Sequence, residues 1–175
     1  MSGKKKITFA RAIMASTLLL VLVSSQMART PGAPVRNSWR GITPLRSSAD
    51  DVAKLIGVEP ESSDASGPFK VEGGMVTFSY LTPSLAKLYR APRSMVGKVF
   101  TIYFKPSEPM SRSELSLPRG FKRCQEERDR TFYYFVSDAG VAYMLLRDSD
   151  RVETIIYQPS RVELRSLAVN TECVF

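Results

Sequence analysis

Three apolar segments near the C-terminus are separated by very short turns, and this spacing constrains the fold more than any other feature. The segments span residues 131–136, 141–146 and 152–157 and are rich in β-branched and aromatic residues. The turns between them are too short for the crossover connection that parallel strands need. The spacing therefore predicts three antiparallel strands in succession, a β-meander.

Two further strands and one helix are predicted before the meander. An alternating stretch at 75–81 and a β-branched, aromatic run at 99–104 are typical of strands. From residue 47 the pattern is helical. Ser47 and Ser48 each precede an aspartate by three residues, the spacing of a helix cap, and Gly57 is placed to end the helix. Residues 83–93 fit a single helical turn. We therefore expect an α+β fold, in which an N-terminal short helix packs on an antiparallel sheet of about four or five strands, a meander.

The first 28 residues have the composition of a secretory signal peptide. A basic start precedes an apolar run from Ala12 to Val23, and small residues follow it. The run is shorter than the roughly 20 apolar residues that a membrane-spanning helix needs. The sequence therefore predicts a cleaved signal at 1–28, a flexible lead-in at 29–38 and a single α+β domain at 39–175. A leader that is retained as an N-terminal membrane anchor is the alternative.

The predicted signal also carries much of the positive charge. The whole chain has 25 Lys and Arg against 17 Asp and Glu, and the first 28 residues hold four of the cations and none of the anions. The remaining surplus of four is typical of a soluble surface and too small for a nucleic-acid interface. No second long apolar run exists, so the mature chain is not expected to span a membrane.

Cys124 and Cys173 are the two cysteines of the chain. An exported protein matures in an oxidising compartment, where an even number of cysteines usually forms disulfide bonds. We therefore expect a disulfide between them, and two separate thiols are the alternative.

The chain has no histidine, and this excludes the most familiar catalytic sites. No Ser-His or Cys-His pair is available for nucleophilic catalysis. Two cysteines alone fall short of the four ligands of an ordinary zinc site. We therefore expect no metal site, no cofactor and no catalytic residue of these types.

Three weaker patterns leave a small exported hydrolase or inhibitor-like protein as the alternative. Ser84-Leu85-Ala86-Lys87 matches the S-x-x-K pattern of penicillin-binding enzymes, but the companion motifs are missing. Three acids at 126–129 could serve acid–base chemistry, although the arginines among them favour a solvated face. The acids at 148–153 resemble a fragment of a calcium loop and form a polar turn more simply.

Two aromatic residues, Trp39 and Tyr89, are candidates for an interaction surface. Aromatic side chains concentrate at the centres of protein interfaces, although burial in a core is the more frequent fate of such residues.

The segment Trp39-Arg40-Gly41-Ile42-Thr43-Pro44-Leu45-Arg46-Ser47, followed by Asp51-Val52 and Gly57, resembles a group of uncharacterised secreted bacterial proteins. That group shares a W-x-G-I-x-P-L-x-S start, a later glycine between two strands (here Gly140), a Tyr-x-Pro strand end (Tyr157 to Pro159) and a cysteine near the C-terminus. This resemblance implies no activity.

A second set of residues resembles the small outer-membrane lipoprotein domain of the SmpA/OmlA (BamE-like) type, and these are Gly41, Asp51, Val52, Ile56, Gly57 and Pro60. The resemblance implies helices on a three-stranded antiparallel sheet and an accessory role in envelope protein assembly. This chain departs from that family because no cysteine directly follows the apolar run, where the family carries its lipid.

These observations together favour an exported, non-enzymatic binding or envelope-accessory module. We expect a secreted or periplasmic location, and a protein or other envelope component as the partner.

Overall fold

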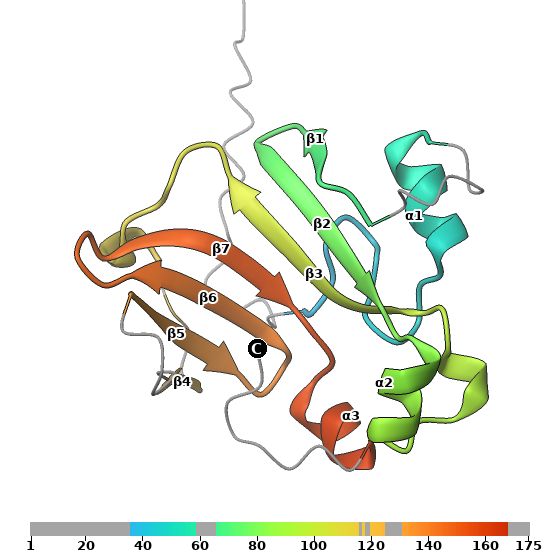
Figure 1. Ribbon diagram of the computed structural model, residues 1–175. Helices are drawn as coiled ribbons and strands as arrows, with labels where there is room; N and C mark the ends of the chain where they lie inside the picture. The colour runs from blue at the N-terminus through green and yellow to red at the C-terminus, as the bar shows by residue number, and fades with distance from the viewer. Residues whose placement is uncertain (1–35, 59–65, 116, 118–119, 125–130, 168–175) are drawn as a thin grey trace, which may run out of the picture. The chain divides into compact units, whose positions relative to one another are not determined.

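The fold is seen in a computed structural model, which describes residues 36–58, 66–115, 117, 120–124 and 131–167. Its elements in chain order are α1 (Ala49–Ile56), β1 (Phe69–Val71), β2 (Gly74–Tyr80), α2 (Pro83–Leu88), the 3-10 turn η1 (Arg93–Met95), β3 (Val99–Pro106), the 3-10 turn η2 (Arg112–Glu114), β4 (Phe121–Cys124), β5 (Phe132–Ser137), β6 (Val141–Leu146), β7 (Arg151–Tyr157) and α3 (Arg161–Ser166). The strands of this described part form one antiparallel sheet in the order β1-β2-β3-β7-β6-β5-β4 (Figure 1).

This architecture shows that the predicted fold class was wrong. We expected an N-terminal short helix on four or five strands, whereas the described residues form mostly a seven-stranded sheet with three short α-helices. The first of these helices begins at Ala49 and is not N-terminal. The five expected strands are present, and the two that the prediction missed are β1 and β4 at the edges of the sheet. These have three and four residues, too few for alternation to stand out in the sequence.

The predicted meander is confirmed, since β5, β6 and β7 pair in succession and are antiparallel. A second antiparallel set, β1-β2-β3, joins it through the pairing of β3 with β7. Ile102 lies opposite Tyr157 in this pairing, and Phe104 lies opposite Ile155. Contacts between segments so distant in the sequence leave no local pattern, and the prediction could not include them.

Buried side chains form three clusters along the sheet. The first lies over β2 and β3 and is covered by the segment before β1, which contributes Trp39, Ile42 and Val52. The second lies over β5, β6 and β7 and includes Leu115 from the segment after η2. The third contains alternate residues of the same strands, such as Tyr134. Strands buried on both faces explain why β5 has little polar alternation.

The predicted boundaries of α1 are confirmed at both ends. The Ser48 hydroxyl accepts a hydrogen bond from the backbone N–H of Asp51, and the Asp51 carboxylate accepts one from the Ser48 N–H at 2.7 Å. Gly57 ends the helix in the left-handed conformation, at φ 78°. Pro60, one of the residues of the resemblance to the SmpA/OmlA type, lies outside the described residues.

Candidate interaction surface

Trp39, one of the two aromatics assigned to an interaction surface, lies in the core. It is 5% exposed, and its ring packs edge-on against Phe78 with 5.9 Å between centroids. Arg40 and Gly41 follow with positive φ angles of 48° and 90°, as the central residues of a type I′ turn require. Trp39 and Ile42 exchange two backbone hydrogen bonds of 2.9 Å across this turn. The tryptophan thus fixes a small hairpin to the sheet and offers almost no surface to a partner.

Tyr89, the second aromatic, is half-buried at the end of α2. Its ring stacks on that of Phe100 at the start of β3, with centroids 5.4 Å apart and planes inclined by 20°. The structure does not unite Tyr89 with Trp39, because the rings that pack on Trp39 belong to Phe78 and Phe104. Tyr89 instead attaches α2 to the sheet.

Ser84 and Lys87 are exposed on α2. A serine nucleophile needs its base within hydrogen-bond reach, about 3 Å, and no hydrogen bond joins these two side chains in the described helix. The acids at 126–129 lie outside the described residues.

The acids at 148–153 face different partners. The Tyr133 hydroxyl donates a hydrogen bond to Asp150, and Arg112 lies 3.8 Å from the same carboxylate. Glu153 instead pairs with Lys105 across β3 and β7. Within the residues that the structure describes, no group of three or more metal-binding side chains is present.

Cys124 lies at the end of β4 and is 4% exposed. Cys173 lies outside the described residues, so the disulfide between them stays a prediction.

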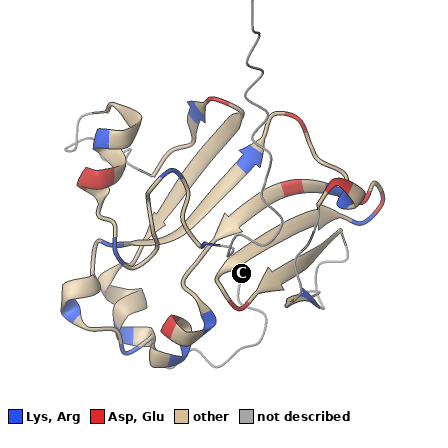
Figure 2. Cartoon of the chain, turned by 180° about the vertical axis from the view of Figure 1, so that it is seen from behind, with Lys and Arg blue, Asp and Glu red and all other residues tan. Residues whose placement is uncertain are grey.

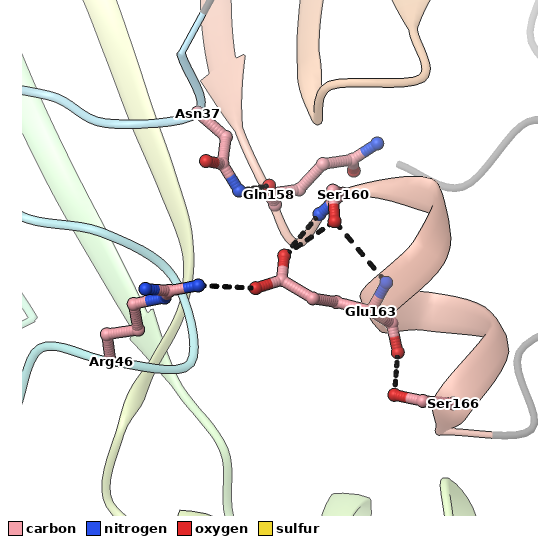
Figure 3. A network of polar contacts seen from close by, with 6 residues as sticks. All are labelled: Asn37, Arg46, Gln158, Ser160, Glu163 and Ser166. Carbon is pink, nitrogen blue, oxygen red and sulfur yellow. Dashed lines mark hydrogen bonds and ion pairs between the residues drawn. The ribbon is translucent and has the colours of Figure 1, made fainter.

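A polar network attaches α3 to segments far from it in the sequence (Figure 3). Glu163 closes a capping box with Ser160, and its second carboxylate oxygen lies 3.8 Å from the guanidinium of Arg46. The Asn37 amide donates to the backbone carbonyl of Gln158 at 3.0 Å. These groups satisfy one another, so the network serves the fold and leaves little capacity for a ligand.

Among the described residues, two carboxyl groups and one phenol have clearly shifted pKa values. Hydrogen bonds from Ser48, first from its backbone N–H, lower the pKa of Asp51 below its ordinary value. The equivalent bonds from Ser111 lower the pKa of Glu114. Burial raises the pKa of Tyr80 to about 12. A general acid at neutral pH needs a raised carboxyl pKa, and these two carboxyls are shifted in the opposite direction.

A hollow of about 630 Å³ lies between the Trp39 hairpin and α1, and two of the three cations that line it, Arg40 and Arg46, already have anionic partners. Arg40 lies 3.8 Å from the carboxylate of Glu72, and Arg46 lies the same distance from that of Glu163. An anionic ligand here would have to compete with both ion pairs. This hollow is therefore a weak candidate for a binding site.

A second hollow, of about 610 Å³, lies between α2 and η1, and its lining residues are Pro83, Ala86, Lys87, Ala91, Arg93 and Val96. Neither of its cations forms an ion pair with a described residue. Next to it in the sequence, Leu88 is 69% exposed, and Val96 on the rim is 37% exposed. We call six of the exposed residues of this segment the α2–η1 surface, and they are Pro83, Lys87, Leu88, Arg90, Arg93 and Val96.

The sequence of α2 explains why these side chains point outward. The Thr82 hydroxyl caps the helix by accepting from the N–H of Leu85 at 3.2 Å, and Pro83 occupies the first turn. Ala86, on the opposite face of the helix, is buried. At the C-terminus, Arg90 adopts a φ of 52°, and Ala91 donates to the carbonyl of Ala86 at 2.8 Å. This is a Schellman ending with arginine at the position where glycine is usual.

The charge of the α2–η1 surface is of one sign. No Asp or Glu occurs in the sequence between Glu72 and Glu108, whereas Lys87, Arg90 and Arg93 are all exposed. Figure 2 shows the α2 and η1 segment in blue and tan, without red. The next cation, Lys98, is half-buried and acts on Asp51. The exposed Leu88 therefore lies close in the sequence to three cations, and this segment contains no carboxylate that could neutralise them.

Sequence reasoning identified Tyr89 in this region but missed the residues around it. The long stretch without acids was visible in the sequence and could have drawn attention to Lys87, Arg90 and Arg93. The exposure of Leu88 could not be foreseen, because its outward direction depends on which face of a six-residue helix packs on the sheet.

Comparisons with known proteins add no relative from which a function could be transferred. No protein family model, no curated protein and no solved structure matches this chain. In the part of the chain that the structure describes, no helix combines the length and the apolar character that crossing a membrane requires.

Proposed function

We propose that this chain is an exported, non-enzymatic binding module that attaches to a component of the cell envelope through the α2–η1 surface. The observation that carries the proposal is the exposed Leu88 beside three exposed cations that have no ion-pair partner among the described residues. A lone exposed leucine is ordinary in soluble proteins. Its combination with a one-sign charged rim is typical of a binding surface.

These cations form no ion pair with a described residue, and this supports the proposal. Arg40 and Arg46 in the other hollow are already engaged by carboxylates, so a ligand there would have to displace them. Arg90 and Arg93 have no such partner in the described part of the chain. An anionic partner can therefore bind them without first breaking an intramolecular contact.

The chemistry of the chain supports a binding role over an enzymatic one. The sequence has no histidine, and the exposed Ser84 has no hydrogen bond to Lys87 in the described helix. The leader-like first 28 residues support export, and a retained leader would place the same domain outside the cytoplasmic membrane.

The proposal is tested by site-specific photo-cross-linking in the cells that export the protein. A cross-linking side chain at Leu88 should form a defined adduct with an envelope component. The matched position is Met75 on β2, which is also exposed, at 43%. Figure 1 shows α2 and the β1–β2 turn at opposite ends of β2. Equal adducts from both positions, or none from Leu88, would contradict the proposal.

An enzymatic role is tested in the same preparation. The purified exported chain should show no hydrolytic turnover that depends on Ser84. A turnover that Ser84→Ala abolishes, with the fold and the Leu88 adduct unchanged, would replace the proposed function with the hydrolase alternative.

A further inference from the structure

We infer that the partner of the α2–η1 surface is the anionic phospholipid surface of a membrane. This inference rests on the proposed function and specifies the chemistry of its partner. Three features carry it, namely the sign of the charge, the exposed aliphatic side chains and the packing of the one aromatic residue in the segment.

The charge of the surface matches a layer of phosphate headgroups. Lys87, Arg90 and Arg93 are exposed, and the sequence has no acid from residue 73 to residue 107. An anionic bilayer attracts each such cation, and one cation near the surface raises the partition coefficient roughly fivefold. The attraction acts between mobile lipids and several cations at once, so it needs no preformed pocket for one headgroup.

The aliphatic residues fit the boundary between headgroups and acyl chains. Leu88 lies between Lys87 and Arg90 in the sequence and Val96 follows Arg93, and they are 69% and 37% exposed. A leucine that enters this boundary loses contact with water, while the long stems of Lys87 and Arg93 can lie along the apolar layer and keep their charges at the phosphates. The arrangement of apolar tips and a cationic rim is that of interfacial membrane binders.

The packing of Tyr89 argues against an acidic protein as the partner. Protein interfaces of specific complexes bury about 800 Å² on each side around aromatic or arginine anchors in fully buried pockets. The aromatic residue of this segment, Tyr89, is half-buried and lies stacked on Phe100. The outward apolar groups are Leu88, the last residue of the six-residue α2, and Val96, which follows η1. A fluid lipid layer needs no aromatic anchor, and the exposed Arg90 and Arg93 can bind its phosphates.

Arg90 adopts a left-handed conformation, with φ 52°, in which glycine would be less strained. Arg40, Leu45 and Asp150 also have positive φ angles, so this conformation alone is no evidence of binding. It does allow the charge of Arg90 to be removed by a substitution that the backbone favours.

The test is co-sedimentation of the exported full chain with vesicles of phosphatidylcholine, with and without phosphatidylglycerol. We expect binding to the vesicles that contain phosphatidylglycerol and little to phosphatidylcholine alone. Raising the salt from about 0.1 M to about 1 M shortens the Debye length from about 10 Å to about 3 Å and should release the protein. Equal binding to both kinds of vesicle, or binding that resists this salt, would overturn the inference.

Matched variants assign the binding to this surface. Leu88→Ser with Arg93→Gln removes one exposed apolar side chain and one charge, and should lower the partition coefficient by roughly tenfold or more. Lys70→Gln with Met75→Ser removes the same two groups from paired positions on β1 and β2, and should change it little. A lower affinity in both pairs to the same degree would overturn the assignment.

Arg90→Gly guards against variants that lose affinity because they lose the fold. Glycine is favoured at this backbone conformation, so the variant should unfold at the same temperature as the parent or higher, and should still bind about fivefold more weakly. Unchanged binding by a folded Arg90→Gly would count against the inference.

The failure of this inference and that of the proposed function are distinguishable. If vesicles are not bound but Leu88 cross-links to a single acidic envelope protein, the lipid inference is wrong and the proposed function stands. If vesicles are not bound and Leu88 forms no adduct in cells, both are wrong.

Discussion

Gly140, between β5 and β6, shows how backbone geometry dictates single residues in this fold. Its φ is 87°, and a Cβ placed on it would lie 2.3 Å from the backbone carbonyl oxygen of Gln158. The carbonyl oxygen of Gly140 accepts the N–H of Gln158 at 2.8 Å, so the end of β7 is held against this turn. Only glycine allows both the conformation and the close approach.

We therefore expect Gly140→Ala to destabilise the protein by about 2–4 kcal/mol, since strain and a backbone clash combine. The control is Gly97→Ala, because Gly97 has a similar φ of 80° but no heavy atom within 4 Å of the added Cβ. That change should cost only about 1 kcal/mol, from strain alone. Urea unfolding of both variants measures the difference, and equal losses would show that the approach to Gln158 is unimportant.

At the scale of elements, three of the five described helices and 3-10 turns begin in the same way. Ser48, Ser111 and Ser160 each form a capping box with an acid three residues later. The first was predictable, because an apolar helical face follows it. The other two carry the same Ser-x-x-Glu signature, but the elements they begin have only three and six residues, too short to show a helical period.

The capping box of α1 makes its stability depend on pH. The pKa of Asp51 is lowered below its ordinary value of 3.8 by the hydrogen bonds from Ser48, so the carboxylate stabilises the fold above about pH 4. That contribution is lost as the pH falls through the lowered pKa. Asp51→Asn should therefore be less stable than the parent at neutral pH, and the difference should shrink on acidification.

Thermal unfolding at several pH values measures this effect, with Asp50→Asn as the matched control. Asp50 lies in the same turn, but the acid that forms the capping box with Ser48 is Asp51. A difference between the parent and Asp51→Asn that stays constant down to low pH would contradict the assignment.

Strands were predictable where they are long and locally paired, and not elsewhere. β5, β6 and β7 have six or seven residues and short turns, so alternation and spacing were sufficient. β1 and β4 are recognisable only in the structure, where each pairs with a longer strand. Phe69 of β1 lies opposite Val76 of β2, and Cys124 of β4 lies opposite Tyr134 of β5. Of the two aromatic residues predicted for an interaction surface, Trp39 lies in the core. Tyr89 stacks on Phe100 within the region that is now the candidate surface.

At the scale of the whole molecule, two antiparallel sets of strands become one sheet through β3 and β7. The register pairs Ile102 with Tyr157 and Phe104 with Ile155, and Lys105 adds an ion pair with Glu153 nearby. The sheet thus depends on contacts between segments that are far apart in the sequence. A covalent link near the C-terminus would lower the conformational entropy of the unfolded chain. Less entropy would then be lost when these contacts form.

The predicted disulfide between Cys124 and Cys173 would be such a link. Closing a loop of about 50 residues stabilises a fold by roughly 4 kcal/mol in the chain-entropy model. Cys173→Ser should therefore lower the free energy of unfolding of the exported protein by up to this amount, and adding reductant to the parent should have the same effect. Alkylation of the unreduced, denatured parent should label no thiol, and two labelled cysteines would contradict the prediction.

We propose that the α2–η1 surface contacts the cell envelope. Amide hydrogen exchange tests this contact, by comparing the purified chain alone with the chain bound to membranes of the cells that produce it. We expect slower exchange in residues 83–98 and unchanged exchange in β1 and in the turn that leads to β2. Protection confined to another part of the chain, or no protection at residues 83–98 in a sample that is demonstrably bound, would contradict it.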